Sequence, residues 1–210
     1  MKAQILAATV ALIAAAPLVP ALADDAWNID SKHAVAEFSV KHMMVSNVRG
    51  TLTGIKGTAN WDGKNIKKLK VDAEIDVRTI NTNEQQRDEH LRSAEFFDAN
   101  KYPVISFRSK KSVAVKGGKF KLIGDLTMHG VTREVQLDVD GPTPAVKDPW
   151  GNERVGATAT TKVNRKDFGI EYNKLLEAGG AVIGDEVSIT LDIELLRSRP
   201  SSPSTGSKSG

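Results

Sequence analysis

Apolar and polar residues alternate along most of this chain, and this alternation limits the fold more than any other feature of the sequence. The segments that show it are 69–77, 131–139, 187–195, 34–44, 105–115, 120–128, 155–163 and, punctuated by glycines, 51–61. Successive side chains of a strand point to opposite faces, so each segment has one apolar face and one polar face. Clean alternation indicates antiparallel sheet, because strands of parallel sheets are buried on both faces and read as unbroken apolar runs.

These segments predict an all-β fold: a single antiparallel β-barrel of about eight strands, a size whose interior is filled by side chains or holds one small ligand. A sandwich also fits the pattern, but a closed barrel is favoured because it hides long strand edges. One short helical segment is expected near residues 84–93. Thr82 to Gln85 resembles a capping box, which makes Thr82 the expected N-cap.

The first 23 residues predict export. Lys2 precedes an apolar run over residues 5–19, and Ala21-Leu22-Ala23 forms a small-x-small cleavage site, so residues 1–23 are predicted to be a signal peptide. An uncleaved anchor is the alternative. We expect a periplasmic protein in which residues 24–196 form one domain, with no membrane span once the signal is removed. Residues 197–210 are rich in Ser, Pro and Gly and are predicted to be a disordered tail.

Composition excludes several kinds of site. The chain has no cysteine, which rules out disulfides, thiolate metal sites and thiol nucleophiles. The formal net charge is +3, but the chain has no cluster of basic residues interleaved with aromatic ones. Nucleic-acid binding is therefore not expected. The four histidines show no metal-binding spacing, and no G-x-S-x-G element is present, so neither a metal site nor an enzyme is predicted.

Small residues on the expected inner faces suggest unfilled space in the barrel. They are Ala34, Ala36, Ala73, Gly124, Ala157, Ala159 and Thr161. A barrel of about eight strands can then hold one small ligand among aliphatic side chains. The alternative is that side chains from facing strands interdigitate and close this space.

Four stretches carry a resemblance that spans nearly all of the expected domain. They are WNIDSKHAVAEFSVKHMMVSNVRG (27–50), RDEHLRSAEFFDANKYPVISF (87–107), GDLTMHGVTREV (124–135) and NRKDFGI (164–170), where Asn164 replaces the usual Ser. In this order they resemble the YceI-like family of exported proteins. The resemblance implies a lipocalin-like barrel whose apolar cavity holds a long isoprenoid or a similar amphiphile.

We therefore expect a periplasmic binding or carrier protein for a polyisoprenoid, a quinone or another apolar-tailed lipid, with no cofactor besides this ligand. The residues expected to line its cavity are Phe38, Val40, Ala73, Ile75, Phe107, Leu126, Met128, Ala157, Ala159, Phe168 and Ile170. The residues expected to meet the head group are Arg87, Asp88, Arg165 and Asp167, with local ion pairing as the alternative. An envelope stress factor that acts through a protein partner, an enzyme acting on an isoprenoid lipid, and a homodimer remain open.

Overall fold

The computed structural model describes residues 26–175 and 181–197, so the predicted signal peptide and residues 198–210 of the predicted tail lie outside it. Its strands are β1 (Ala26–Ile29), β2 (Val35–His42), β3 (Ser46–Thr53), β4 (Lys56–Asn60), β5 (Lys70–Asp76), β6 (Val104–Ala114), β7 (Lys119–Met128), β8 (Val131–Asp140), β9 (Val146–Lys147), β10 (Glu153–Asn164) and β11 (Ile183–Arg197). The described helices are α1 (Gln85–Arg92) and the 3-10 turns η1 (Ile66–Lys68), η2 (Val77–Thr79) and η3 (Arg165–Phe168).

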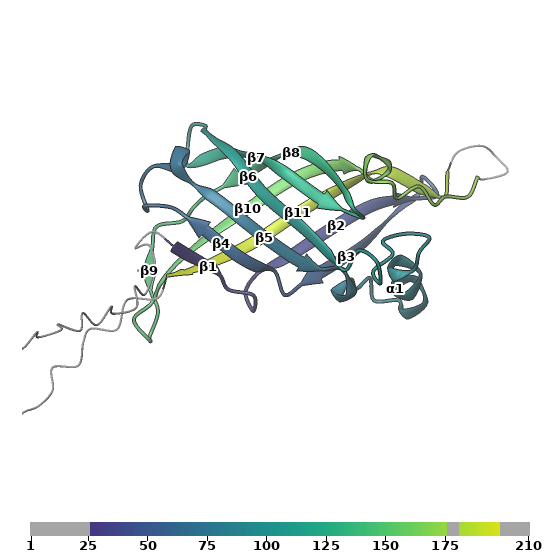
Figure 1. Ribbon diagram of the computed structural model, residues 1–210, viewed down its shortest axis with the longest axis horizontal. Helices are drawn as coiled ribbons and strands as arrows, with labels where there is room; N and C mark the ends of the chain where they lie inside the picture. The colour runs from purple at the N-terminus through teal and green to yellow at the C-terminus, as the bar shows by residue number, and fades with distance from the viewer. Residues whose placement is uncertain (1–25, 176–180, 198–210) are drawn as a thin grey trace, which may run out of the picture.

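The sheet closes on itself because β11 pairs with strands on both sides. The antiparallel order runs β1-β4-β5-β6-β7-β8-β10-β11 and returns to β1. This closed barrel confirms the predicted fold, and β5, β8 and β11 fall on the segments with the clearest alternation (Figure 1). β11 also extends one residue into the predicted tail, because Arg197 pairs with Glu153 and its guanidinium lies 4.4 Å from the ring centre of Trp27.

Residues 51–61 do not form the single kinked strand that the sequence predicted. The segment divides after Thr53, where Gly54 has φ of +70° and takes the backbone out of the extended region. β3 then pairs with β2, whereas β4 pairs with β1 and β5. The division lets β3 extend the sheet beside β2 while β4 closes the barrel.

Helix α1 lies at the end of the barrel opposite β9 (Figure 1). Its N-cap is Glu84, whose carboxylate accepts hydrogen bonds from the backbone N–H groups of Gln86 and Arg87. The predicted cap at Thr82 was wrong, because the Thr82 hydroxyl donates to Asp88 instead. None of the helices in the described residues has the length and apolar character needed to cross a membrane.

The two ends of the barrel are packed differently. At the β9 end, the Trp27 and Trp61 rings lie 6.0 Å apart, and the Trp27 indole N–H donates to the Trp61 carbonyl. At the α1 end, a second group of buried side chains joins the helix segment to η3. Its members are Phe96, Met128, Val163, Phe168 and Ile170. The barrel interior lies between these two groups.

Candidate functional site

An apolar cavity of about 280 Å³ runs along the barrel interior. Its lining extends from Trp61 and Leu69 at the β9 end to Phe96 and Ile183 at the α1 end. The exposed wall consists entirely of apolar atoms, and even Arg165 contributes only such atoms to it. The volume is close to the lower limit for small-molecule pockets, which are roughly 300–1,000 Å³. Such a cavity suits a hydrocarbon chain and offers a polar group no partner.

The structure places nearly all of the predicted lining residues on the cavity wall. Those found there are Phe38, Val40, Ala73, Ile75, Phe107, Leu126, Met128, Ala157, Ala159 and Ile170. They come from β2, β5, β6, β7, β10 and the segment after η3, so most of them reach the interior through strand alternation. Their contact with a ligand stays a prediction.

Phe168 is the predicted lining residue that the structure places elsewhere. The expectation relied on strand alternation from residue 165 onward, but residues 165–168 form the 3-10 turn η3, where alternation does not apply. Phe168 is 2% exposed and packs with Phe96, Met128 and Val163. Its carbonyl lies 3.2 Å from Nδ1 of His129, so this residue joins η3 to the β7–β8 turn and belongs to the core.

Several lining residues were missed in the sequence. Phe120 and Leu122 share the parity of Leu126 and Met128 on β7, so the same alternation could have identified them. Trp61 also lines the cavity and shares the parity of Ile55 and Ala59 in the segment 51–61, whereas Phe96 and Phe97 lie in a connecting segment that carries no periodic signal.

Arg165 is buried, and its guanidinium N–H groups donate hydrogen bonds to backbone carbonyls of residues that follow it in the chain. Nε donates to the carbonyl of Gly184 at 3.0 Å, and one terminal nitrogen donates to the carbonyls of Ile170 and Tyr172 at 2.6 and 2.9 Å. Burial lowers the pKa of the guanidinium, and the charge of Asp185 partly offsets this shift. The structure therefore gives Arg165 the structural role that the sequence left open.

The local ion pair between Arg165 and Asp167, which was the alternative to head-group contact, is absent from the described part of the structure. Asp167 is exposed, because η3 turns its side chain away from the buried guanidinium. The carboxylate beside Arg165 belongs to Asp185 at 3.3 Å, and Lys166 contacts the same residue at 2.9 Å. Asp167 is thus separated from Arg165, and its predicted contact with a ligand head group stays a prediction.

Replacing Arg165 with methionine should lower the free energy of unfolding by about 2–4 kcal/mol, because several loop carbonyls lose their donor. Lys166→Met is the matched control, since it removes an exposed cation from Asp185 and should cost at most about 1 kcal/mol. Urea denaturation of both variants gives the comparison. If Arg165→Met is as stable as the unmodified chain and selectively loses ligands with polar heads, the residue reads the head group instead.

Arg87 and Asp88 are also used within the fold. Arg87 donates from Nε to the Thr82 hydroxyl at 2.7 Å and from Nη2 to the Thr82 carbonyl at 3.0 Å. Asp88 Oδ1 accepts from the Thr82 N–H and hydroxyl at 2.8 and 2.6 Å. Neither residue lines the cavity, and within the described residues they do not form the local ion pair that was the alternative; each instead bonds Thr82 and fastens α1 to the preceding segment.

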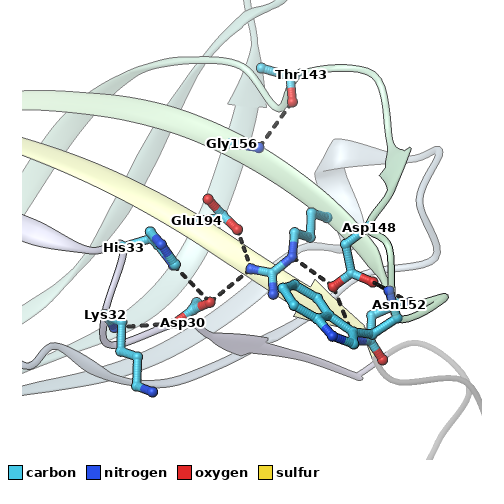
Figure 2. Close-up of polar contacts among 10 residues, drawn as sticks. Asp30, Lys32, His33, Thr143, Asp148, Asn152, Gly156 and Glu194 are labelled. Atoms are coloured by element: carbon cyan, nitrogen blue, oxygen red, sulfur yellow. Dashed lines mark hydrogen bonds and ion pairs between the residues drawn. The ribbon is translucent and has the colours of Figure 1, made fainter.

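A separate polar cluster lies toward the β9 end (Figure 2). The Arg154 guanidinium contacts Asp30 at 2.7 Å, Asp148 at 2.9 Å and Glu194, so it joins the β1–β2 turn, the β9–β10 turn and β11. Asp30, His33 and Glu194 bring potential metal-ligand atoms within 4.8 Å of one another. Arg154 already supplies the positive charge between the carboxylates of Asp30 and Glu194. The arrangement therefore stabilises the contact of β10 and β11 with the β1–β2 turn.

Because of this cluster, we expect the free energy of unfolding to depend on pH. Hydrogen bonds from Arg154, and secondly from His33, lower the pKa of Asp30 to about 2 from its ordinary value of 3.8. A lowered folded-state pKa means that the stabilisation is complete above about pH 4 and is lost as the pH falls toward 2. Asp30→Asn should therefore be less stable at pH 7 and lose less stability between pH 4 and 2. Urea midpoints across this range test it, and parallel pH curves for both proteins would contradict it.

Comparison with known proteins adds independent findings. A family model described as a YceI-like domain matches residues 27–195. A UPF0312 protein from Vibrio parahaemolyticus is 36% identical over 170 residues, which cover 81% of this chain and 89% of that protein. A YceI protein from Campylobacter jejuni has a similar structure, with a TM-score of 0.63 and 28% identity over 76% of this chain and 90% of that one.

The same fold occurs in a more distant solved structure. It is a polyisoprenoid binding domain from Saccharophagus degradans, which is implicated in plant cell wall breakdown. Its TM-score is 0.58, with 15% identity over 80% of this chain and 97% of that one. At this identity the likeness concerns the fold alone.

Proposed function

The chain belongs to the YceI-like family, and on that premise we propose that it binds the apolar tail of a lipid in its barrel cavity and carries it through the periplasm. The observation that carries this proposal is the entirely apolar wall of the 280 Å³ cavity. A hydrocarbon chain gives up no hydrogen bonds by entering such a space and gains about 0.8 kcal/mol for each methylene removed from water, which offsets the entropy lost on binding. A polar ligand would leave hydrogen-bonding groups without partners.

An isoprenoid or quinone tail is the first ligand class to test. The domain from S. degradans with the same fold is described as polyisoprenoid binding, which supports this choice. Because the cavity wall carries no polar atom, the head group has to remain outside the cavity. The protein should therefore accept tails of one kind with several different heads.

The same wall favours binding over catalysis. Acid–base or nucleophilic chemistry needs a positioned side chain within hydrogen-bond reach of the reacting atoms. Among the residues that the structure describes, the cavity presents carbon to its contents, so a bound tail meets no such group. A carrier that releases its ligand unchanged fits this chemistry.

The periplasmic part of the proposal depends on residues 1–23. If they act as a signal peptide, the protein recovered from a periplasmic extract should begin at Asp24. Intact-mass measurement of the extracted protein tests this directly. Recovery of the uncleaved chain in the membrane fraction would support the anchor alternative.

Titration with prenols of increasing length tests ligand binding. Once the exposed Trp150 is replaced by phenylalanine, Trp61 on the cavity wall reports occupancy by its fluorescence, and Trp27, which does not line the cavity, contributes the background that a titration of Trp61→Phe measures. Affinity should rise with each added methylene and level off once the cavity is full. An affinity that does not depend on tail length would contradict binding in this cavity.

A further inference from the structure

Large apolar side chains are exposed where the β2–β3 hairpin meets the segment before β11. Met43 is 43% exposed, Met44 65%, Val45 82% and Leu175 88%, and together we call them the apolar tip. The Met43 N–H donates to the Val182 carbonyl at 2.7 Å, and Leu175 pairs with Ala181 across a bridge. The two segments are thus tied together, and the apolar tip is one surface.

The backbone of the β2–β3 hairpin turn does not require the methionines at positions 43 and 44. Met43 and Met44 have φ of 50° and 62°, a left-handed conformation that a two-residue hairpin turn normally fills with Asn or Gly. Methionine makes this turn less favourably than those residues do. The hairpin therefore exposes long apolar side chains although its backbone favours small or polar residues.

Cations outnumber unpaired carboxylates near the apolar tip, where Glu171 is the exposed acid in the described part of the segment before β11, and Asp185 and Glu186 are paired with Lys166 and Lys162. Lys41 and Lys174 are exposed next to it and Arg49 lies further along β3, and within the described part of the chain none of the three has a carboxylate partner. No acidic residue occurs between Glu37 and Asp62 in the sequence. Exposed apolar groups with flanking cations are the features of a surface that binds an anionic bilayer, where cations meet the head groups and apolar side chains enter the interface.

The strands that lead to the apolar tip also line the cavity. Val40 and Ile183 line the cavity wall, and Val40 is three residues from Met43. The β2–β3 hairpin and the segment leading into β11 lie at the α1 end, away from the β9 end (Figure 1). The remaining exposed apolar residues are scattered, and they include Val104 at 40% at the start of β6. The others are Val113 and Val115 near the β6–β7 turn and Val146 and Trp150 beside β9.

We propose that the apolar tip docks the protein on an anionic bilayer, with the α1 end of the cavity against the membrane. Docking in this orientation lets a lipid tail pass between bilayer and cavity without crossing water, which would otherwise oppose transfer. The proposal rests on the proposed function, because it describes how the same cavity is loaded and emptied.

A site-specific fluorescent label tests the docking. The chain has no cysteine, so Met44→Cys can carry a single environment-sensitive dye such as nitrobenzoxadiazole, with Val113→Cys as the matched control. With vesicles of phosphatidylglycerol and phosphatidylcholine, the dye at position 44 should shift to the blue and be quenched by spin-labelled lipid, and the dye at 113 should not. Because each dye reports only its own surroundings, residues 1–23 cannot imitate this signal if they are retained. Equal responses at both positions, or none at 44, would overturn the proposal.

A transfer assay separates docking from ligand binding. The Met44→Ser/Val45→Ser variant should take up a long prenol from anionic vesicles at least tenfold more slowly, yet bind a short prenol from water as before. The control Val113→Ser/Val115→Ser should transfer normally.

The outcomes separate the two proposals. If the unmodified chain binds short prenols but both double variants transfer at the same rate, the docking proposal is contradicted and the proposed function stands. If the label inserts but no prenol binds, docking stands and the proposed function fails. A blue shift that rises with protein concentration without vesicles would mean that the apolar tip pairs two copies of the chain, which would also overturn docking.

Discussion

Phe168→Ala is expected to lower the free energy of unfolding by about 3–5 kcal/mol, the usual cost of truncating a fully buried phenylalanine. The residue is 2% exposed and packs against Phe96, Met128 and Val163 without lining the cavity. The loss should therefore be in stability, while the folded fraction binds prenols with nearly unchanged affinity. Urea denaturation and prenol titration of the same preparation give both quantities.

Phe97→Ala is the matched control, because Phe97 lines the cavity and is only partly buried. It should lose less stability than Phe168→Ala and more affinity for long tails. If Phe168→Ala were instead stable and selectively defective in binding, Phe168 would be part of the ligand site, and the separation between core and cavity made here would be wrong.

Ala159→Phe is expected to weaken binding of the longest accepted prenol by about a hundredfold, the equivalent of three to four buried methylenes at about 0.8 kcal/mol each. Ala159 lines the cavity between Val139 and Leu191 on the neighbouring strands. An apolar cavity of about 150 Å³ is enough to hold benzene, so a phenyl ring would take roughly half of the space. Short prenols should bind almost as well as before. Titration with a prenol series measures the cutoff.

Thr160→Phe is the control for Ala159→Phe, because it adds the same ring to the outer face of the same strand. It should leave both stability and the length cutoff unchanged. If the space around Ala159 is in fact close-packed, Ala159→Phe should cost about 1–3 kcal/mol of stability through overpacking and leave the cutoff where it was. That result would contradict the position of the cavity.

Strand alternation was enough to predict the barrel and most of its inner face. Segments such as 69–77 and 187–195 have long, regular patterns, and the structure places β5 and β11 there. β1 has only four residues, too few for a period to be recognised. The break between β3 and β4 depends on the backbone of Gly54, because glycine is compatible with both a kinked strand and a left-handed turn.

The roles of the charged residues could not be predicted because their partners are distant in sequence. Arg165 binds carbonyls at residues 170, 172 and 184, and its nearest carboxylate is Asp185, not the neighbouring Asp167. Arg154 likewise reaches Asp30, 124 positions away. The burial of Phe168 was missed for a local reason, since strand parity was extended across a 3-10 turn. Alternation predicts which face of a strand a side chain occupies. It predicts nothing about side chains beyond the end of the strand.

Lipid that copurifies with the protein gives the most direct test of the central claim. Folded protein is purified without detergent and extracted with chloroform and methanol, and the extract is analysed by mass spectrometry beside Ala159→Phe prepared in the same way. We predict about one apolar-tailed lipid per chain, enriched over the bulk membrane lipids and shorter or absent in Ala159→Phe. An extract without such a lipid, together with no uptake of prenols by the same protein, would contradict the claim that the barrel is a lipid-binding site.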